Sequence, residues 1–316
     1  MKLQELKQNL DDLQLAMTGR TSSDITVELN KLVEAGGKKF RPGLMFLMGT
    51  VFGLPTKKLT TYARSVELTH LASLIHDDVI DASDKRRNHP TLNSIKNNTT
   101  AILAGDYVLA TIMGELAREN NNELLIDLTV CIQDLADGEW LQYALKSKER
   151  VEFADLEQIC IKKTGSLIRY CCTTPAKLAG HHDIPTMAFL GERIGLIFQM
   201  ADDIVDGLNQ SGRPAYQDII NGQFNYVTLK LKELYPELSD ALYAFKKNPT
   251  GNLPWTDAQY QAAIHGVHNA INAEKDKIFT IFSKLCQDKN QEDFIPVFEM
   301  MINKIQSNYA LAFENT

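Results

Sequence analysis

The chain has 316 residues, 44% hydrophobic and 23% charged, proportions that exclude a disordered or collagen-like chain. Its 33 Lys and Arg against 40 Asp and Glu give a net charge of -7, which argues against the broad basic surface that non-specific nucleic-acid binding needs. The 5 cysteines form no CxxC pair, no apolar run approaches about 18 residues, and the first residues lack the apolar core of a signal peptide. We therefore expect a globular protein of the reducing cytosol with no transmembrane segment.

Apolar residues recur at helical spacing along most of the chain, and runs that alternate with a period of two are scarce. Ser22 and Ser23 can cap a first helix that ends at Gly36. Further along, apolar residues in steps of three and four predict helices over 68–82 and 190–208. The pattern is typical of an all-α protein.

The later part of the chain contains clear helix boundaries. Segments 209–214 and 248–252 are rich in Asn, Gly and Pro and predict loops. Thr256 then can cap the next-to-last helical block. Because we find no linker and no shift in composition, we predict one all-α domain over residues 1–316.

The two helices predicted over 68–82 and 190–208 each carry the pattern DDxxD near their C-terminal end. Its six carboxylates are Asp77, Asp78, Asp81, Asp202, Asp203 and Asp206. The first and last Asp of each pattern lie one turn apart on the same helix face, and the middle Asp is turned by about 100°. Mg²⁺ would offset their repulsion, because it takes carboxylate oxygens and shares its shell with phosphates and water. A solvated acidic surface is the competing interpretation, which two copies on apolar helices make weaker.

Basic residues stand in three short motifs. These motifs are Gly36-Gly37-Lys38-Lys39-Phe40-Arg41-Pro42, Lys85-Arg86-Arg87 and Lys163-Thr164-Gly165. Each motif by itself is usually a solvated patch. Together with the acidic helices they indicate a site for anionic phosphates, to which Arg supplies forked hydrogen bonds and Lys a point charge.

In their order, these motifs resemble those of the trans-isoprenyl diphosphate synthases, the polyprenyl synthetase family. The matching segments, from Gly36 to about Leu229, include the three basic motifs, the two acidic patterns, Glu67-Leu68-Thr69-His70 and Gly105-Asp106-Tyr107. The resemblance implies an all-helical bundle around a deep central cavity, usually dimeric, that performs magnesium-dependent prenyl transfer.

The resemblance also implies roles for individual residues. An allylic diphosphate would be held through Mg²⁺ by Asp77, Asp81 and Asp202, with Asp78, Asp203 and Asp206 supporting that metal shell. Arg86 and Lys163 would contact the same diphosphate directly, and Thr164 and Gln199 would lie beside that diphosphate. The second substrate, isopentenyl diphosphate, would bind Lys38, Arg41, His70 and Arg87. The implied catalytic group is Asp77, Asp81, Asp202, Lys163 and Arg86.

The implied chemistry explains this set of residues. Ionising an allylic diphosphate separates a carbocation from a highly charged leaving group, which metal ions and basic side chains stabilise. The isopentenyl double bond attacks the cation, and the released diphosphate can take the proton. An apolar cavity would keep water from the cation.

Small residues precede the first acidic pattern on its helix. They are Thr69, Ala72 and Ser73, and they leave the path for a growing chain open. We therefore expect a product of geranylgeranyl size or longer. The alternative is that small residues here only permit close helix packing.

Four positions depart from the family pattern. Arg213 follows Gly212 where a Lys is common, and Gln223 replaces another common Lys, so one diphosphate contact is lost. Asn88 stands where a Gly usually follows the two arginines, and segment 308–313 carries no basic tail.

Other functions remain open on the sequence alone. A terpene cyclase also ionises a prenyl diphosphate, but it has no use for a second diphosphate site. A head-to-head synthase of the squalene type lacks this basic set. A partner-dependent subunit fits if the chain acts only with a small companion, so we expect a homodimer or such a heterodimer.

Overall fold

The computed structural model describes residues 3–17, 24–35, 37–86, 89–208, 215–287 and 291–306. The contacts of the chain divide it into two compact units, Met1–Ile132 with Tyr170–Met187 and Gln133–Arg169 with Ala188–Thr316. The predicted all-α class is confirmed, since nearly all described elements are helices. A single domain over 1–316 and a deep central cavity stay predictions.

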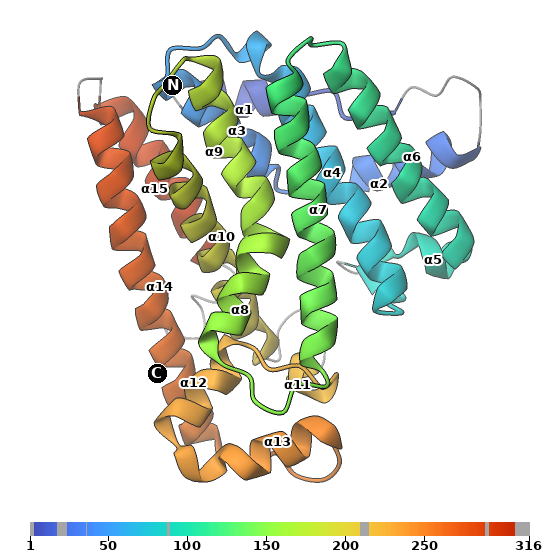
Figure 1. The fold of residues 1–316 in the computed structure, drawn as a ribbon, viewed down its shortest axis with the longest axis vertical. Coiled ribbons are helices and arrows are strands. Elements are labelled where there is room, and N and C mark those ends of the chain that lie inside the picture. The colour runs from blue at the N-terminus through green and yellow to red at the C-terminus, as the bar shows by residue number, and fades with distance from the viewer. Residues whose placement is uncertain are drawn as a thin grey trace. The chain divides into compact units, whose positions relative to one another are not determined.

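The first unit holds the N-terminal helices (Figure 1). Its elements are α1 (Leu3–Asp11), α2 (Asp24–Ala35), α3 (Phe40–Val51), the 3₁₀ turn η1 (Thr56–Lys58), α4 (Thr60–Ile80), β1 (Lys85–Arg86), β2 (His89–Pro90), α5 (Leu92–Ile95) and α6 (Asn98–Ala117). Three helices have residues in both units: α7 (Asn122–Leu145), α9 (Ser166–Leu178) and α10 (Ile184–Asp206).

Helix α4 forms the middle of the first unit, with α3 and α6 packed against it. Of the apolar residues that predict a helix over 68–82, Leu68 and Ile75 are buried, and Leu71 and Val79 are half-buried. Ala82 is exposed, because α4 ends at Ile80. A Cβ on Gly105 of α6 would lie only 2.2 Å from the Nε2 atom of His76. Glycine at this position therefore lets α6 approach α4 closely.

After α4 the chain makes a short antiparallel ribbon that we did not predict. Lys85 pairs with Pro90 and Arg86 with His89. Strands of two residues are too short to show an alternating pattern, so the sequence contains no signal for them.

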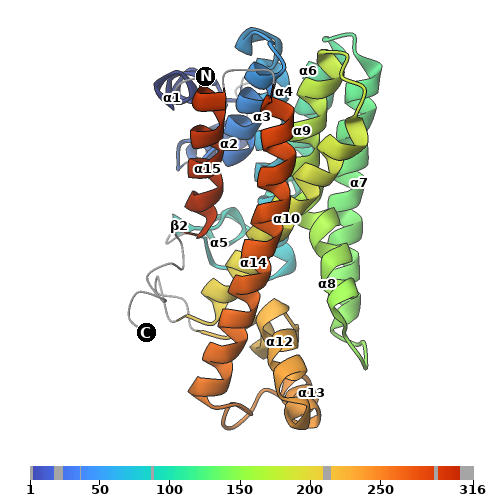
Figure 2. The ribbon, with the colours of Figure 1, turned by 90° about the vertical axis from the view of Figure 1, so that its left-hand side faces the viewer.

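The second unit contains the C-terminal helices. Its further elements are α8 (Phe153–Cys160), the π-turn η2 (Ile161–Gly165), α11 (Gln217–Ile220), α12 (Tyr226–Leu234), the 3₁₀ turn η3 (Pro236–Leu238), α13 (Ser239–Lys247), α14 (Asp257–Cys286) and α15 (Gln291–Gln306). Helix α14 packs against α15 and, toward its other end, against α12 (Figure 2).

Several predicted helix boundaries are confirmed. Thr256 caps α14 in a capping box with Gln259, and 248–252 is a loop between α13 and α14. On α10 the stripe residues Leu190, Ile194, Ile197, Ala201 and Ile204 are all buried. Ser22, Ser23, Gly36 and the loop 209–214 lie outside the described residues.

In the described part of the chain, α6 is long and apolar enough to cross a membrane by length and composition. Its most apolar stretch is 33% buried in the protein. Core helices pass the same test, so one helix of this kind is weak evidence for a membrane span.

Candidate functional site

In the first acidic pattern, the middle carboxylate binds an arginine. Asp78 is 6% exposed, and its Oδ1 atom accepts a hydrogen bond from the Nε atom of Arg86 at 2.9 Å. The Nη2 atom of Arg86 also lies 2.8 Å from this oxygen. Arg86, predicted to contact a diphosphate, is therefore anchored to the acidic helix by a fork of two nitrogens.

The outer carboxylates of this pattern lie nearer the surface. Asp77 is half-buried, and Asp81, the residue that caps the C-terminus of α4, is exposed. Beyond it, Ala82 adopts a left-handed conformation with φ 50°, and the amides of Ala82 and Ser83 donate to the carbonyls of Val79 and Asp78. This Schellman motif ends the helix and directs the chain toward β1.

In the second acidic pattern, the middle carboxylate binds uncharged groups instead. Asp203 is 3% exposed and accepts hydrogen bonds from Gln199 Nε2 at 2.9 Å and from the backbone amide of Tyr226 at 2.7 Å. Burial raises the pKa of Asp203 well above its usual value, and the charge of Asp218 adds to the shift. The bond to Tyr226 ties the C-terminal end of α10 to the first residue of α12.

The outer carboxylates of the second pattern differ from each other. Asp202 is exposed. Asp206 is half-buried, and its two oxygens accept hydrogen bonds from the amides of Gln217 at 3.0 Å and Asp218 at 3.4 Å. Asp206 therefore caps the N-terminus of α11.

The motif Lys163-Thr164-Gly165 forms most of the π-turn η2, an interruption that is frequent at functional sites. Glycines let neighbouring helices approach this turn. A Cβ on Gly138 of α7 would lie 2.9 Å from the amide nitrogen of Lys163, and one on Gly195 of α10 only 2.5 Å from Gly165 Cα. The hydroxyl of Thr164 donates to Gln199 Oε1 at 3.3 Å, so these two residues lie together.

Acidic side chains of α7 pair with the basic residues of η2 and α9. Lys163 forms an ion pair with Glu139 and donates to Gln142 Oε1 at 2.9 Å. Asp134 binds both Lys162, at 3.0 Å, and Arg169, at 2.6 Å. We did not predict these α7 residues, because more than twenty residues separate them from their partners; only the small residue Gly138 beside Glu139 marks a close approach in the sequence.

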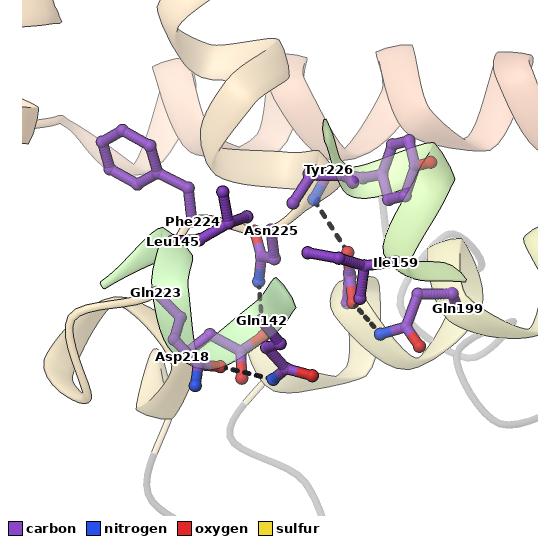
Figure 3. Close-up of a pocket in the computed structure, with 11 residues that line it drawn as sticks. Gln142, Leu145, Ile159, Gln199, Asp218, Gln223, Phe224, Asn225 and Tyr226 are labelled. Atoms are coloured by element: carbon purple, nitrogen blue, oxygen red, sulfur yellow. Dashed lines mark hydrogen bonds between the residues drawn. The ribbon is translucent and has the colours of Figure 1, made fainter. Parts of the chain in front are cut away.

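A pocket of about 70 Å³ lies beside this network, within the second unit (Figure 3). Its polar lining consists of Gln142, Gln199, Asp203, Asp218, Gln223 and Asn225. Pockets for drug-sized ligands measure roughly 300–1,000 Å³. This pocket has room for a few water molecules and not for a prenyl chain.

Three of the four residues predicted to bind isopentenyl diphosphate lie in the described part of the first unit. Lys38 is exposed just before α3, while Arg41 on α3 and His70 on α4 are half-buried on helices that pack together. Arg87, together with Asn88, lies outside the described residues, as do Arg213 and 308–313.

The residues predicted to set product length are directed into the first unit. Ala72 is fully buried, Thr69 is 1% exposed and Ser73 is half-buried. The hydroxyls of Thr69 and Ser73 donate to the carbonyls of Ser65 and His70, respectively, so both are satisfied within α4.

The donor set of the acidic patterns suits a hard divalent cation, since every candidate ligand is a carboxylate oxygen. Among the residues that the structure describes, no three His, Cys, Asp or Glu side chains form a group that could hold a metal ion. Mg²⁺ commonly binds through one or two carboxylates plus substrate phosphates and water. The residues present therefore fit a metal that arrives with its diphosphate.

Comparisons with known proteins identify the family of the chain. The family model "Polyprenyl synthetase" matches residues 24–252. The chain is 34% identical to a prenyl transferase of Synechocystis sp. over 247 residues, 74% of this chain and 75% of that protein. It is 31% identical to the mitochondrial solanesyl-diphosphate synthase 1 of Oryza sativa subsp. japonica over 270 residues, 76% of this chain but 63% of the rice protein.

A solved structure has the same fold. It is the polyprenyl synthase of Caulobacter crescentus CB15 complexed with calcium and isoprenyl diphosphate. That structure matches with a TM-score of 0.74 and 22% identity over 96% of this chain and 94% of the other. The predicted resemblance is thus confirmed both by sequence and by fold, and the chain belongs to the polyprenyl synthetase family, a family of prenyltransferases.

Proposed function

We propose that the chain condenses isopentenyl diphosphate with an allylic diphosphate to make a trans-polyprenyl diphosphate. One observation carries this proposal: η2 presents Lys163 and Thr164 beside α10, the helix that also bears Gln199 and Asp202. A cation, a hydroxyl and a carboxylate on neighbouring elements are what a metal-bound diphosphate requires.

Mg²⁺ is the proposed metal, with Asp77, Asp81 and Asp202 as its carboxylate ligands. When bound, it would neutralise charge that develops on the leaving diphosphate. The calcium in the Caulobacter complex supports a divalent cation in this family. From the chain itself, Lys163 and Arg86 would bind and orient the diphosphate oxygens.

A product of geranylgeranyl size or longer is part of the proposal. It is supported by the small side chains of Thr69 and Ala72, both buried on α4, and by the likeness to a solanesyl-diphosphate synthase. Ala72→Phe should shorten the product without abolishing condensation, because an aromatic ring adds bulk one turn and a half before Asp77. Chromatography of the products measures this; an unchanged product distribution would remove Ala72 from the argument.

A dimer in the cytosol completes the proposed function. Exposed apolar residues support a protein interface on the first unit: Ile102 and Leu103 on α6, and Ile126 and Val130 on α7. A reducing compartment is supported by the five buried cysteines, none of which forms a disulfide.

The decisive assay uses the purified chain with Mg²⁺, isopentenyl diphosphate and farnesyl diphosphate. The proposal expects elongated trans-polyprenyl diphosphates. Turnover that appears only with an added small companion subunit would favour the heteromeric form, and a hydrocarbon product without isopentenyl diphosphate would favour a terpene cyclase.

A further inference from the structure

The side chain of Gln142 bridges two residues that are distant in the sequence. Its Nε2 atom donates to Gln223 Oε1 at 2.8 Å, and its Oε1 atom accepts from Lys163 Nζ at 2.9 Å. Both bonds lie within the second unit, and Figure 3 shows the contact between Gln142 and Gln223 in the pocket.

The direction of these bonds follows from the donors available. An ammonium group only donates, so Gln142 has to present its oxygen to Lys163. Its amide nitrogen then faces Gln223, which must accept. A Lys at position 223 has no acceptor, so it could not hold Gln142 in this orientation.

The same bridge restricts the Lys163 side chain, whose four-carbon stem is flexible. Glu139 pairs with the ammonium on one side, and Gln142 binds it on another. The side chain of Lys163 is 23% exposed, so a ligand can still reach it.

We propose that Gln142 and Gln223 are positioning residues for Lys163: Gln223 orients the Gln142 amide, whose oxygen holds the ammonium where it binds a diphosphate. The inference rests on the proposed function of Lys163. It also explains the departure at Gln223, because this side chain exchanges a direct charge contact for control of the neighbouring lysine.

The test is a double-mutant cycle on the full-length chain. Calorimetry measures the binding of inorganic pyrophosphate in Mg²⁺ to the wild type, Gln223→Met, Lys163→Met and the double variant. Lys163→Met should weaken binding roughly 10- to 100-fold, and Gln223→Met roughly 3- to 10-fold. In the Lys163→Met background, the added Gln223→Met change should alter binding less than about 2-fold, because its effect passes through Lys163.

Two further variants separate positioning from general support of the fold. Gln223→Glu keeps the accepting oxygen and should restore binding to within about 3-fold of the wild type. Gln133→Met, at an exposed position of α7, the helix that bears Gln142, should leave binding unchanged. If Gln223→Met does not fold, Gln142→Met enters the same cycle in its place, with the same expected coupling.

The outcomes distinguish this inference from the proposed function. An equal loss from Gln223→Met with and without Lys163, or no loss at all, overturns the positioning role while wild-type prenyl transfer persists. A wild type that neither binds pyrophosphate nor transfers a prenyl group overturns the proposed function and this inference with it.

Discussion

The two acidic patterns have the same sequence spacing but different surroundings. In both, the middle carboxylate is buried, at 6% exposure for Asp78 and 3% for Asp203. Asp78 binds the charged side chain of Arg86, whereas Asp203 binds an amide side chain and a backbone amide. The shared spacing thus determines which carboxylate is buried, while the surroundings of each pattern determine which groups bind that carboxylate.

The consequence is a difference in electrostatics. A guanidinium beside a buried carboxylate offsets the cost of removing it from water, and neutral donors offset less of that cost. Near Asp203 the carboxylate of Asp218 adds repulsion, and the pKa of Asp203 is raised accordingly. The first pattern therefore holds a carboxylate paired with a guanidinium, and the second one a carboxyl group whose charged form is disfavoured.

Substitutions of the outer carboxylates should have the largest effect, because both patterns are proposed to supply metal ligands from these positions. Asp77→Ala and Asp202→Ala should each lower turnover by orders of magnitude and leave the helical fold intact, because each removes a proposed metal ligand. Steady-state prenyl transfer and circular dichroism measure the two effects. Asp240→Ala, at an exposed position of α13, is the matched control and should retain wild-type turnover. Near-normal rates in either variant would count against the two patterns acting together.

Substitutions of the two middle carboxylates should change the stability of the protein by different amounts. Asp78→Asn leaves Arg86 without its anionic partner and should lower the free energy of unfolding by about 1–2 kcal/mol. Asp203→Asn replaces a buried carboxyl, whose charged form burial already disfavours, with a neutral amide of the same shape. The amide oxygen still accepts from Tyr226, and the amide nitrogen can donate to Gln199 once that side chain turns to present its oxygen, so the free energy of unfolding should stay within about 1 kcal/mol of the wild type or rise. Denaturant titration without divalent metal measures both. Equal losses in the two variants would show that the surroundings of the patterns do not matter.

The sequence alone predicted the features that depend on local spacing. The stripe on α10 gave its buried face, Thr256 marked the start of α14, and the helical angle of about 100° predicted that Asp78 and Asp203 turn away from the outer carboxylates. These features follow from the geometry of one helix, so they need no knowledge of the remaining chain.

The contacts that complete the site could not be predicted in this way. The bond between Arg86 and Asp78 depends on a Schellman turn at Ala82, where no glycine marks the left-handed residue. The ion pair of Lys163 with Glu139 depends on a π-turn, for which the sequence has no periodic signal. Both contacts depend on departures from the regular α-helix, a left-handed turn and a π-turn, and a helical pattern encodes neither.

The last residue of each pattern separates the two regions further. Asp206 caps α11, so Asp206→Ala should lower the free energy of unfolding by about 1 kcal/mol. Asp81 is an exposed anion at the C-terminus of α4, where the helix dipole disfavours negative charge, so Asp81→Ala should change stability by less than about 0.5 kcal/mol. Thermal unfolding of both variants without metal measures the difference. If Asp81→Ala lowered the free energy of unfolding as much as Asp206→Ala, the stabilising role of Asp206 as a cap of α11 would be contradicted.

The smallest effect concerns the turn that follows the first pattern. Ala82 has φ 50°, a conformation that costs an alanine roughly 1–2 kcal/mol and a glycine very little. Glycine also loses more conformational freedom on folding, so Ala82→Gly should raise the free energy of unfolding by less than about 1 kcal/mol. The same substitution at the exposed helical residue Ala110 of α6 should lower it by about 1 kcal/mol. Denaturant titration of the two variants gives opposite signs if the Schellman turn ends α4, and a loss at both positions would show that Ala82 is not held in the left-handed conformation in solution.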